Sequence, residues 1–202
     1  MCIRDRFISI NTLEVWAQRI SYVGELGYEL YIERDLAKEL FNTLFKSGAK
    51  YNLSLCGMHA MDIMRMESGF VHWGHDISPE ENQFQAGLSF AISFKKNVSF
   101  IGRDVLEKIK DKKVDKSLKI LTLENSKPGE PLLLHDEPIY HNNKIVGRTT
   151  SGCFSFNFNK NISYGYINSG MTSDQIENSN FEIEVEKKKY RATVLKLSLI
   201  HI

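Results

Sequence analysis

The sequence has few of the features that mark specialised classes of protein. It contains only 3 cysteines, and none of them forms a Cys-x-x-Cys pair, so neither a disulfide framework nor a zinc site is indicated. No apolar run approaches the roughly 20 residues of a membrane-spanning helix, and no secretory signal is recognisable. The 26 basic and 25 acidic residues give a net charge of +1, which attracts neither nucleic acid nor an anionic membrane. We therefore expect a cytoplasmic protein without nucleic-acid or membrane partners.

The composition is that of a globular protein, but the residues at both ends of the chain do not look like part of the natural protein. Hydrophobic residues make up 42% of the sequence and aromatic residues 11%, enough for a sizeable core. Residues 1–6 and 197–202 resemble translated sequencing-adapter ends and are left out of the fold argument. We interpret the chain as a fragment of a longer protein.

The first part of the chain mixes helical and extended patterns. Apolar spacing predicts an amphipathic helix over Leu36–Lys46, with Asp35 as its N-cap and Gly48 just beyond its end. A second helix is predicted over Gly57–Glu67, where methionines at helical spacing indicate a stripe that faces the core. The segment Gly87–Phe94 is predicted to be a strand.

The second part is predicted to consist almost entirely of short strands. A short helix and a charged linker occupy residues 97–116. Beyond them the strands are expected at 117–124, 131–135, 138–140, 144–150, 162–167, 181–186 and 190–196, with tight hairpin turns at Asn142-Asn143 and at residues 186–189. Many short strands at regular spacing favour a small barrel or sandwich, so the fold class is α+β.

The stretch from Ser21 to Ile32 is dense in groups that could carry chemistry. It is predicted to form a strand, a turn marked by Gly24 and a second strand. In the second strand Glu29 and Tyr31 would share one face. A carboxylate beside an aromatic ring suits a flat heterocycle with adjacent N–H donors. The alternative is an edge strand with Glu29 in solvent.

Two other clusters of polar residues are interpreted as structural and not as functional sites. His72-Trp73-Gly74-His75-Asp76 offers two imidazoles and a carboxylate, but Gly74 indicates a loop, and a catalytic metal needs at least three ligands at workable geometry. We expect the histidines to form hydrogen bonds within that loop and assign no metal. Asp62 and Arg65 are predicted to form an ordinary surface ion pair.

Several motifs in fixed order carry a family resemblance. They are Arg19-Ile20-Ser21-Tyr22-x-Gly24-Glu25-Leu26-Gly27-x-Glu29-Leu30-Tyr31, Asp62-x-x-Arg65-x-Glu67-x-Gly69, His72 to Ile77, Ala86-Gly87-Leu88, Phe100 to Asp104, Thr150-Ser151-Gly152 and Tyr164-Gly165-Tyr166. Over about residues 7–196 this pattern resembles the aminomethyltransferase family. The run Gly24 to Leu30 looks more like the folate-binding C-terminal half of dimethylglycine and sarcosine dehydrogenases than like the glycine-cleavage T-protein. Met61 also departs from the T-protein pattern, which tends to place an arginine there.

The resemblance implies a domain layout and a set of binding residues. Residues 7–96 would be the C-terminal portion of a folate-binding α+β domain, and residues 117–196 a small antiparallel β-barrel domain. Glu29 would accept hydrogen bonds from the pterin of tetrahydrofolate, and further folate-site positions would be Tyr22, Leu30, Tyr31 and Phe90. Phe90 falls where a tyrosine often sits, so the hydroxyl is missing. The catalytic aspartate of the family precedes Phe7, so no catalytic residue is assigned.

The implied function is that of one part of a larger enzyme. A flavin domain of the same full-length chain, with FAD in the missing N-terminal half, would oxidise an N-methyl amine, and tetrahydrofolate would capture the carbon as 5,10-methylenetetrahydrofolate. This chain alone would be inactive. The alternatives are a glycine-cleavage aminomethyltransferase, a folate-binding homologue without catalysis, and two small domains whose glycine-rich turns only imitate the family.

Overall fold

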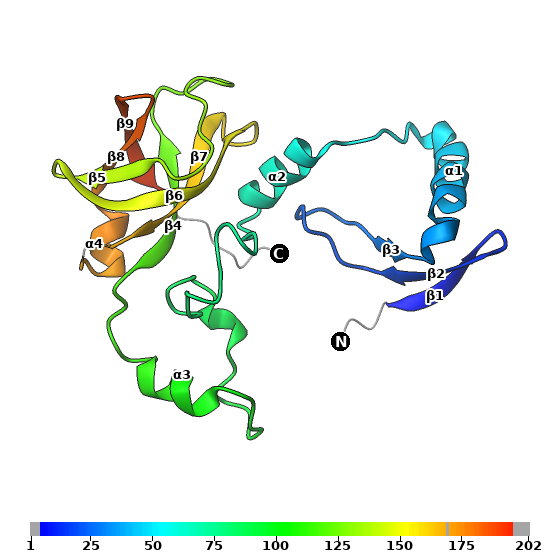
Figure 1. Cartoon of the computed structure of the whole chain (residues 1–202), viewed down its shortest axis with the longest axis horizontal. Coiled ribbons are helices and arrows are strands. Elements are labelled where there is room, and N and C mark those ends of the chain that lie inside the picture. Colours follow the sequence, from blue (N-terminus) through cyan, green and yellow to red (C-terminus); the bar gives the residue numbers. More distant parts are fainter. Residues whose placement is uncertain (1–4, 169, 196–202) are drawn as a thin grey trace. The chain divides into compact units, whose positions relative to one another are not determined.

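The computed structural model describes residues 5–168 and 170–195. The chain divides after Ser68 into two compact units, which Figure 1 shows and which are described separately here. Of the ends interpreted as adapter-derived, residues 1–4 and 197–202 lie outside the described residues, whereas Arg6 begins the first strand and pairs with Ala17.

The first unit is a small antiparallel sheet with one helix packed on it. Strands β1 (Arg6–Ile10), β2 (Leu13–Gln18) and β3 (Glu29–Tyr31) pair in the order β1-β2-β3. Buried and solvent-facing residues alternate along β2, so one face of the sheet is buried. Helix α1 (Ala37–Gly48) covers that face. The core consists of Leu13, Val15 and Leu40, with Ile8, Ile10, Leu30, Ile32 and Leu44 packed against it.

Helix α1 confirms the predicted helix but not its caps. The turn before it is a 3₁₀-helix, η1 (Arg34–Leu36), which contains Asp35, and no side chain caps α1. Gly48 is the last helical residue, with φ −79°, and η2 (Ala49–Tyr51) continues the chain until Asn52 turns left-handed with φ 59°. A side chain at Gly48 would lie 2.5 Å from Leu53, so the glycine is explained by close packing there.

Helix α2 (Met58–Glu67) begins and ends as predicted, but its buried side chains are different ones. Gly57 is the N-cap, and Gly69 follows the helix with φ 80°. The methionine stripe is only partly buried, because Met61 and Met64 are half-buried whereas Met58 is 71% exposed. The buried side chains are Met66 and Arg65, the latter only 1% exposed. The pair between Arg65 and Asp62, at 2.7 Å, is therefore not the surface ion pair that the sequence predicts.

The second unit is built around a closed six-strand antiparallel barrel of strand order β4-β7-β6-β5-β8-β9, seen in Figure 1. This result confirms the α+β class and the predicted barrel. The strands are β4 (Ser117–Leu123), β5 (Pro138–His141), β6 (Lys144–Ser155), β7 (Lys160–Ile167), β8 (Asn180–Val185) and β9 (Lys188–Val194). Before the barrel lie η3 (Ser89–Ala91) and α3 (Arg103–Ile109), and α4 (Ser173–Glu177) connects β7 to β8.

The hairpin turns of the barrel follow the sequence, whereas two predicted strands are wrong. Residues 142–143 and 186–187 have positive φ, as tight hairpin turns require. No strand forms at 131–135, where alternation arises because Leu133 points into the barrel core while its neighbours are exposed. No strand forms at 87–94 either, because Gly87 has φ 73° and the chain there makes turns and η3.

Candidate functional site

Strand β3 presents a carboxylate and a phenol on the face of the sheet opposite α1. Glu29 and Tyr31 lie on this outer face, and Leu30 between them packs into the core on the inner face. The Tyr31 hydroxyl donates a hydrogen bond to Glu29 Oε2. This bond, together with the negative charge of Glu29, raises the pKa of Tyr31 above its ordinary value. Tyr31 therefore stays a neutral donor at physiological pH.

An aromatic row crosses all three strands on the same outer face. Phe7 on β1 lies opposite Trp16 on β2, and Trp16 lies opposite Tyr31 on β3. The ring centroids are 6.4 Å apart for Phe7 and Trp16 and 5.2 Å apart for Trp16 and Tyr31. The exposed fractions of the three residues are 68%, 38% and 45% in the same order. Solvent-facing aromatic rings therefore lead directly to the carboxylate of Glu29.

The loop before Glu29 is held in place by the end of α2. The strand predicted over residues 20–23 is wrong, because β2 ends at Gln18 and the chain then bends through residues 22–26. The hydroxyl of Ser68, the C-cap of α2, has two acceptors, Met64 O at 2.9 Å and Val23 O at 3.3 Å, so it bridges the end of the helix and the loop. A Cβ at Gly24 would lie 2.0 Å from Ser68 Oγ, and Gly24 also has φ 71°. Only glycine meets both conditions, and Tyr22 is held half-buried in this loop.

Four of the five predicted folate-site residues belong to this unit. Tyr22, Glu29 and Tyr31 lie in the loop and on the outer face, while the side chain of Leu30 lies on the inner face, where it fixes the strand. Phe90 lies in η3 of the second unit and is 72% exposed. The assignment of Phe90 to the folate site therefore stays a prediction from the sequence.

A buried carboxylate organises the histidine-containing loop of the second unit. Asp76 is 1% exposed. Its Oδ1 accepts the Thr150 hydroxyl at 2.6 Å and the Ser151 hydroxyl at 2.7 Å, and its Oδ2 accepts the His72 backbone N–H at 2.8 Å. Local sequence patterns could not predict this anchor, because the two hydroxyl partners on β6 are more than 70 residues away. The hydrogen bonding predicted for this loop thus centres on the carboxylate.

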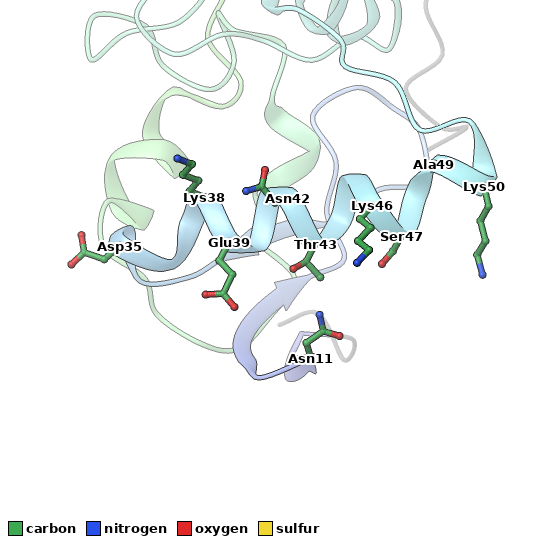
Figure 2. A pocket seen from close by; sticks show the side chains of 10 residues that line it. All are labelled: Asn11, Asp35, Lys38, Glu39, Asn42, Thr43, Lys46, Ser47, Ala49 and Lys50. Carbon is green, nitrogen blue, oxygen red and sulfur yellow. The ribbon is translucent and has the colours of Figure 1, made fainter.

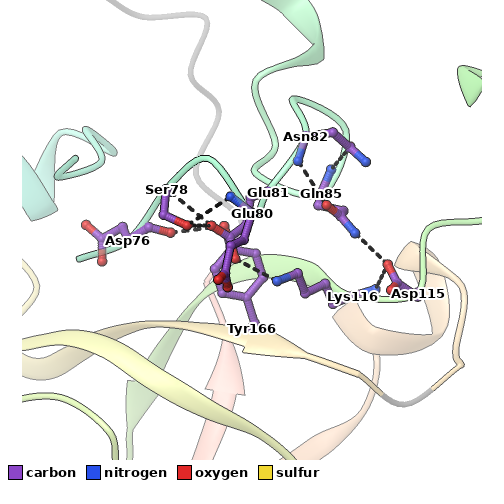
Figure 3. Close-up of polar contacts among 9 residues, drawn as sticks. All are labelled: Asp76, Ser78, Glu80, Glu81, Asn82, Gln85, Asp115, Lys116 and Tyr166. Atoms are coloured by element: carbon purple, nitrogen blue, oxygen red, sulfur yellow. Dashed lines mark hydrogen bonds and ion pairs between the residues drawn. The ribbon is translucent and has the colours of Figure 1, made fainter. Parts of the chain in front are cut away.

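A second polar network joins the loop that follows to the start of β4, as Figure 3 shows. Lys116 Nζ lies 2.6 Å from Glu81 Oε1 and 4.9 Å from the centre of the Tyr166 ring. Burial alone would raise the pKa of Glu81, but hydrogen bonds from Lys116 and Ser78 outweigh it, so this pKa is below its ordinary value. Burial, reinforced by Glu81 and Asp76, raises the pKa of Tyr166. The Glu81 carboxyl group is therefore ionised at neutral pH.

Two surface hollows accompany these groups. One, of about 530 Å³, lies beside Asp76 and is lined by groups of both signs, including Lys116 and Arg148. Another, of about 990 Å³, is open and polar and runs along the outer side of α1. Figure 2 shows its lysine, acidic and amide side chains on α1, with Asn11 from the β1–β2 turn nearby. This larger hollow contains none of the predicted site residues.

The described residues contain neither a cluster of metal ligands nor a helix that could span a membrane. Within residues 5–168 and 170–195, no group of three or more His, Cys, Asp or Glu side chains is placed to hold a metal ion. In the same ranges no helix is long and apolar enough to span a membrane.

An α+β unit followed by a closed antiparallel barrel defines the class of protein, and comparison with known proteins identifies the family. The model named GCVT N-terminal domain matches residues 3–96, and the model named glycine cleavage T-protein C-terminal barrel domain matches residues 116–200. The chain therefore belongs to the glycine cleavage T-protein family, which confirms the resemblance seen in the sequence.

The relatives include oxidases and dehydrogenases as well as aminomethyltransferases. A 4-methylaminobutanoate oxidase (formaldehyde-forming) from Paenarthrobacter nicotinovorans is 35% identical over 94% of this chain. The mitochondrial dimethylglycine dehydrogenase of Homo sapiens is 30% identical over 98% of this chain. The chain spans only 22% of the length of each. The crystal structure of aminomethyltransferase T from Bartonella henselae matches with a TM-score of 0.78 at 22% identity, covering 91% of this chain and 49% of that one, which supports the same fold.

Proposed function

We propose that the chain is the tetrahydrofolate-binding part of a FAD-dependent N-methyl amine dehydrogenase of the dimethylglycine or sarcosine type. In the full-length protein the oxidised one-carbon unit would leave as 5,10-methylenetetrahydrofolate. The observation that carries the proposal is the position of Glu29 on the outer sheet face, beside the hydroxyl and ring of Tyr31. The family and the dehydrogenase relatives named above support it.

The groups around Glu29 fit the chemistry of a reduced pterin. A carboxylate accepts two adjacent N–H donors in bidentate fashion, and the pterin ring carries such a pair on its amino-pyrimidine edge. Glu29 is half-buried, so these bonds would be partly shielded from water. Tyr31 supplies a ring face next to the carboxylate, and Tyr22 closes the loop that leads to it. The donors of the ligand and the acceptors of the site are therefore complementary.

Bound tetrahydrofolate would supply the two nitrogens that capture the one-carbon unit. The residues of this chain would bind and orient it. Glu29 would hold the pterin edge, Tyr31 would hold the Glu29 carboxylate in place, and the contact between Ser68 and Val23 would fix the loop before them. Such fixed placement contributes to capture mainly through proximity.

The test is calorimetric titration of tetrahydrofolate, under reducing conditions, into the chain and into its Glu29→Gln variant. The amide keeps the shape of the side chain but replaces one acceptor oxygen by a donor. We expect a loss of about 1.5–3 kcal/mol in binding, the range for hydrogen bonds to a charged group. Glu14→Gln is the matched control, because Glu14 is an exposed carboxylate on the same outer face, opposite Ser9. Equal loss in both variants, or no loss in either, would refute a pterin contact at Glu29.

The alternative within the family is an aminomethyltransferase, to which the matched structure belongs by name. The two functions differ in the polypeptide before residue 7. The dehydrogenase proposal predicts a flavin-binding G-x-G-x-x-G segment far upstream in the full-length gene. A complete reading frame that begins only about 170 residues earlier, at ordinary domain length, would favour the aminomethyltransferase.

A further inference from the structure

The second unit carries an exposed apolar surface at the start of α3, which we call the α3 patch. It consists of Val98, Phe100, Ile101 and Val105, whose exposed fractions are 67%, 37%, 104% and 61% in that order. Side chains of these types are ordinarily buried. Single exposed apolar residues need no explanation, but several of them gathered on one short segment indicate an interaction surface.

A hollow of about 470 Å³ belongs to the same surface. Its lining includes three residues of the α3 patch, Val98, Phe100 and Ile101, together with the apolar side chains of Ile92 and Leu106. Ile101 is fully exposed although it helps to line the hollow. One surface therefore offers both a projecting apolar side chain and an apolar recess, so it can be complementary to a second copy of itself.

The backbone around the hollow is held in place by Arg103, the first residue of α3. The guanidinium donates to three carbonyl oxygens of the preceding loop and to one carboxylate of the helix. The acceptors are Phe94 O at 2.9 Å, Lys96 O at 2.9 Å, Val98 O at 3.0 Å and Glu107 Oε1 at 3.0 Å. One side chain thus fixes the loop to the helix. A surface that is ordered before it binds loses less conformational entropy when a partner arrives.

The charges on α3 indicate which partner the α3 patch takes. Asp104 lies in the first turn of the helix and Lys108 in the last, and both are exposed, as is Val105 between them. About a two-fold axis perpendicular to α3, the helix of a second copy runs antiparallel, so Asp104 of each chain approaches Lys108 of the other. A helix with one sign of charge would repel its own copy, whereas this arrangement pairs opposite charges.

We propose that the α3 patch is a homodimer interface, in which Ile101 of each chain enters the apolar hollow of the other. The contact is isologous, because the projecting side chain and the recess belong to the same surface. Asp104 of one chain pairs with Lys108 of the other at its rim. The patch contributes far fewer than the roughly 20 to 30 residues a side of a standard interface, so we expect a weak dimer that forms reversibly at micromolar concentrations. The interface is independent of the proposed folate contacts of Glu29, since all of its residues lie in the second unit.

The test is sedimentation equilibrium of the whole chain from the low to the high micromolar range. Ile101→Glu places a charge in the apolar hollow of the partner and should weaken the dimer by about tenfold or more. Ile145→Glu is the matched control, because Ile145 is a 64% exposed isoleucine on β6 of the same unit, outside the α3 patch. Both side chains are exposed, so neither change disturbs the core, and the control should leave the association unchanged.

An exchange of charges tests the antiparallel pairing. Asp104→Lys and Lys108→Asp, each alone, set like charges against each other twice in every dimer and should weaken it by about three- to tenfold. The chain with both changes again brings opposite charges together and should recover the affinity of the unaltered chain within about twofold. A parallel helix pair would show no such recovery, because each position would then face itself.

Three results would overturn the proposal, and none of them bears on tetrahydrofolate binding. A monomer at every concentration would mean that a second copy does not cover the α3 patch. A dimer that Ile101→Glu leaves intact, or that Ile145→Glu weakens equally, would place the interface elsewhere. A double charge exchange that fails to recover the affinity would exclude the pairing of Asp104 with Lys108 and the interface built on it.

Discussion

Replacement of Asp76 by asparagine tests whether a buried carboxylate holds the histidine-containing loop on the barrel. The side chain is 1% exposed and accepts two hydroxyls on one oxygen and a backbone N–H on the other. The Asp76→Asn variant keeps the shape but has one acceptor oxygen and one NH₂ group. If the NH₂ group faces the His72 N–H, two donors confront each other. If it faces Thr150 and Ser151, both hydroxyls must reorient to accept.

The expected cost follows from these two arrangements. A hydrogen bond to a charged group contributes about 1.5–3 kcal/mol, and a buried donor left without a partner costs about 1–3 kcal/mol. The variant adopts whichever orientation costs less, so we expect a loss of about 2–4 kcal/mol in the free energy of unfolding of the second unit. For a unit of about 130 residues this loss corresponds to a Tm lower by about 10 °C.

The assay is urea unfolding followed by tryptophan fluorescence. Trp73 lies in the same loop as Asp76, so a Trp16→Phe background makes the signal specific to this unit. Asp136→Asn is the control, because Asp136 is an exposed carboxylate in the same unit, paired with Arg148; we expect a change below about 1 kcal/mol there. If Asp76→Asn unfolds within about 0.5 kcal/mol of the unaltered chain, the anchoring role is wrong.

Three further changes test single features of the fold. Gly24→Ala should destabilise the first unit by about 2 kcal/mol or more, because it adds a clash to a positive φ; Gly57→Ala, in open space, should change thermal unfolding by less than about 0.5 kcal/mol. Glu81→Gln should cost about 1–2 kcal/mol at pH 7. Because the folded-state pKa of Glu81 is lowered, this difference should shrink as the pH falls from the ordinary glutamate value of about 4.3 toward the folded value. Lys187→Gly should raise the stability of the barrel by about 0.5–1 kcal/mol, since Lys187 has φ 65° in a hairpin turn.

Much of the fold can be predicted from local pattern. Helices α1 and α2, the two hairpin turns and most barrel strands follow from apolar periodicity and turn chemistry, which act within a few residues. Two of the errors share one cause, which is burial set by distant contacts. Leu133 alternates with its neighbours because it enters the barrel core, and Arg65 is buried by contacts that helical spacing does not reveal.

The candidate site likewise depends partly on local sequence pattern and partly on contacts between residues that are far apart in the sequence. Alternation along β3 is enough to place Glu29 and Tyr31 on one face, because side chains two residues apart in a strand point to the same side of the sheet. The aromatic row could not be predicted, because it depends on the pairing of β3 with β2 and of β2 with β1. That pairing in turn depends on a long loop between β2 and β3, held at Gly24 by a serine more than 40 residues away. A change at Gly24 should therefore weaken ligand binding at Glu29 as well as stability.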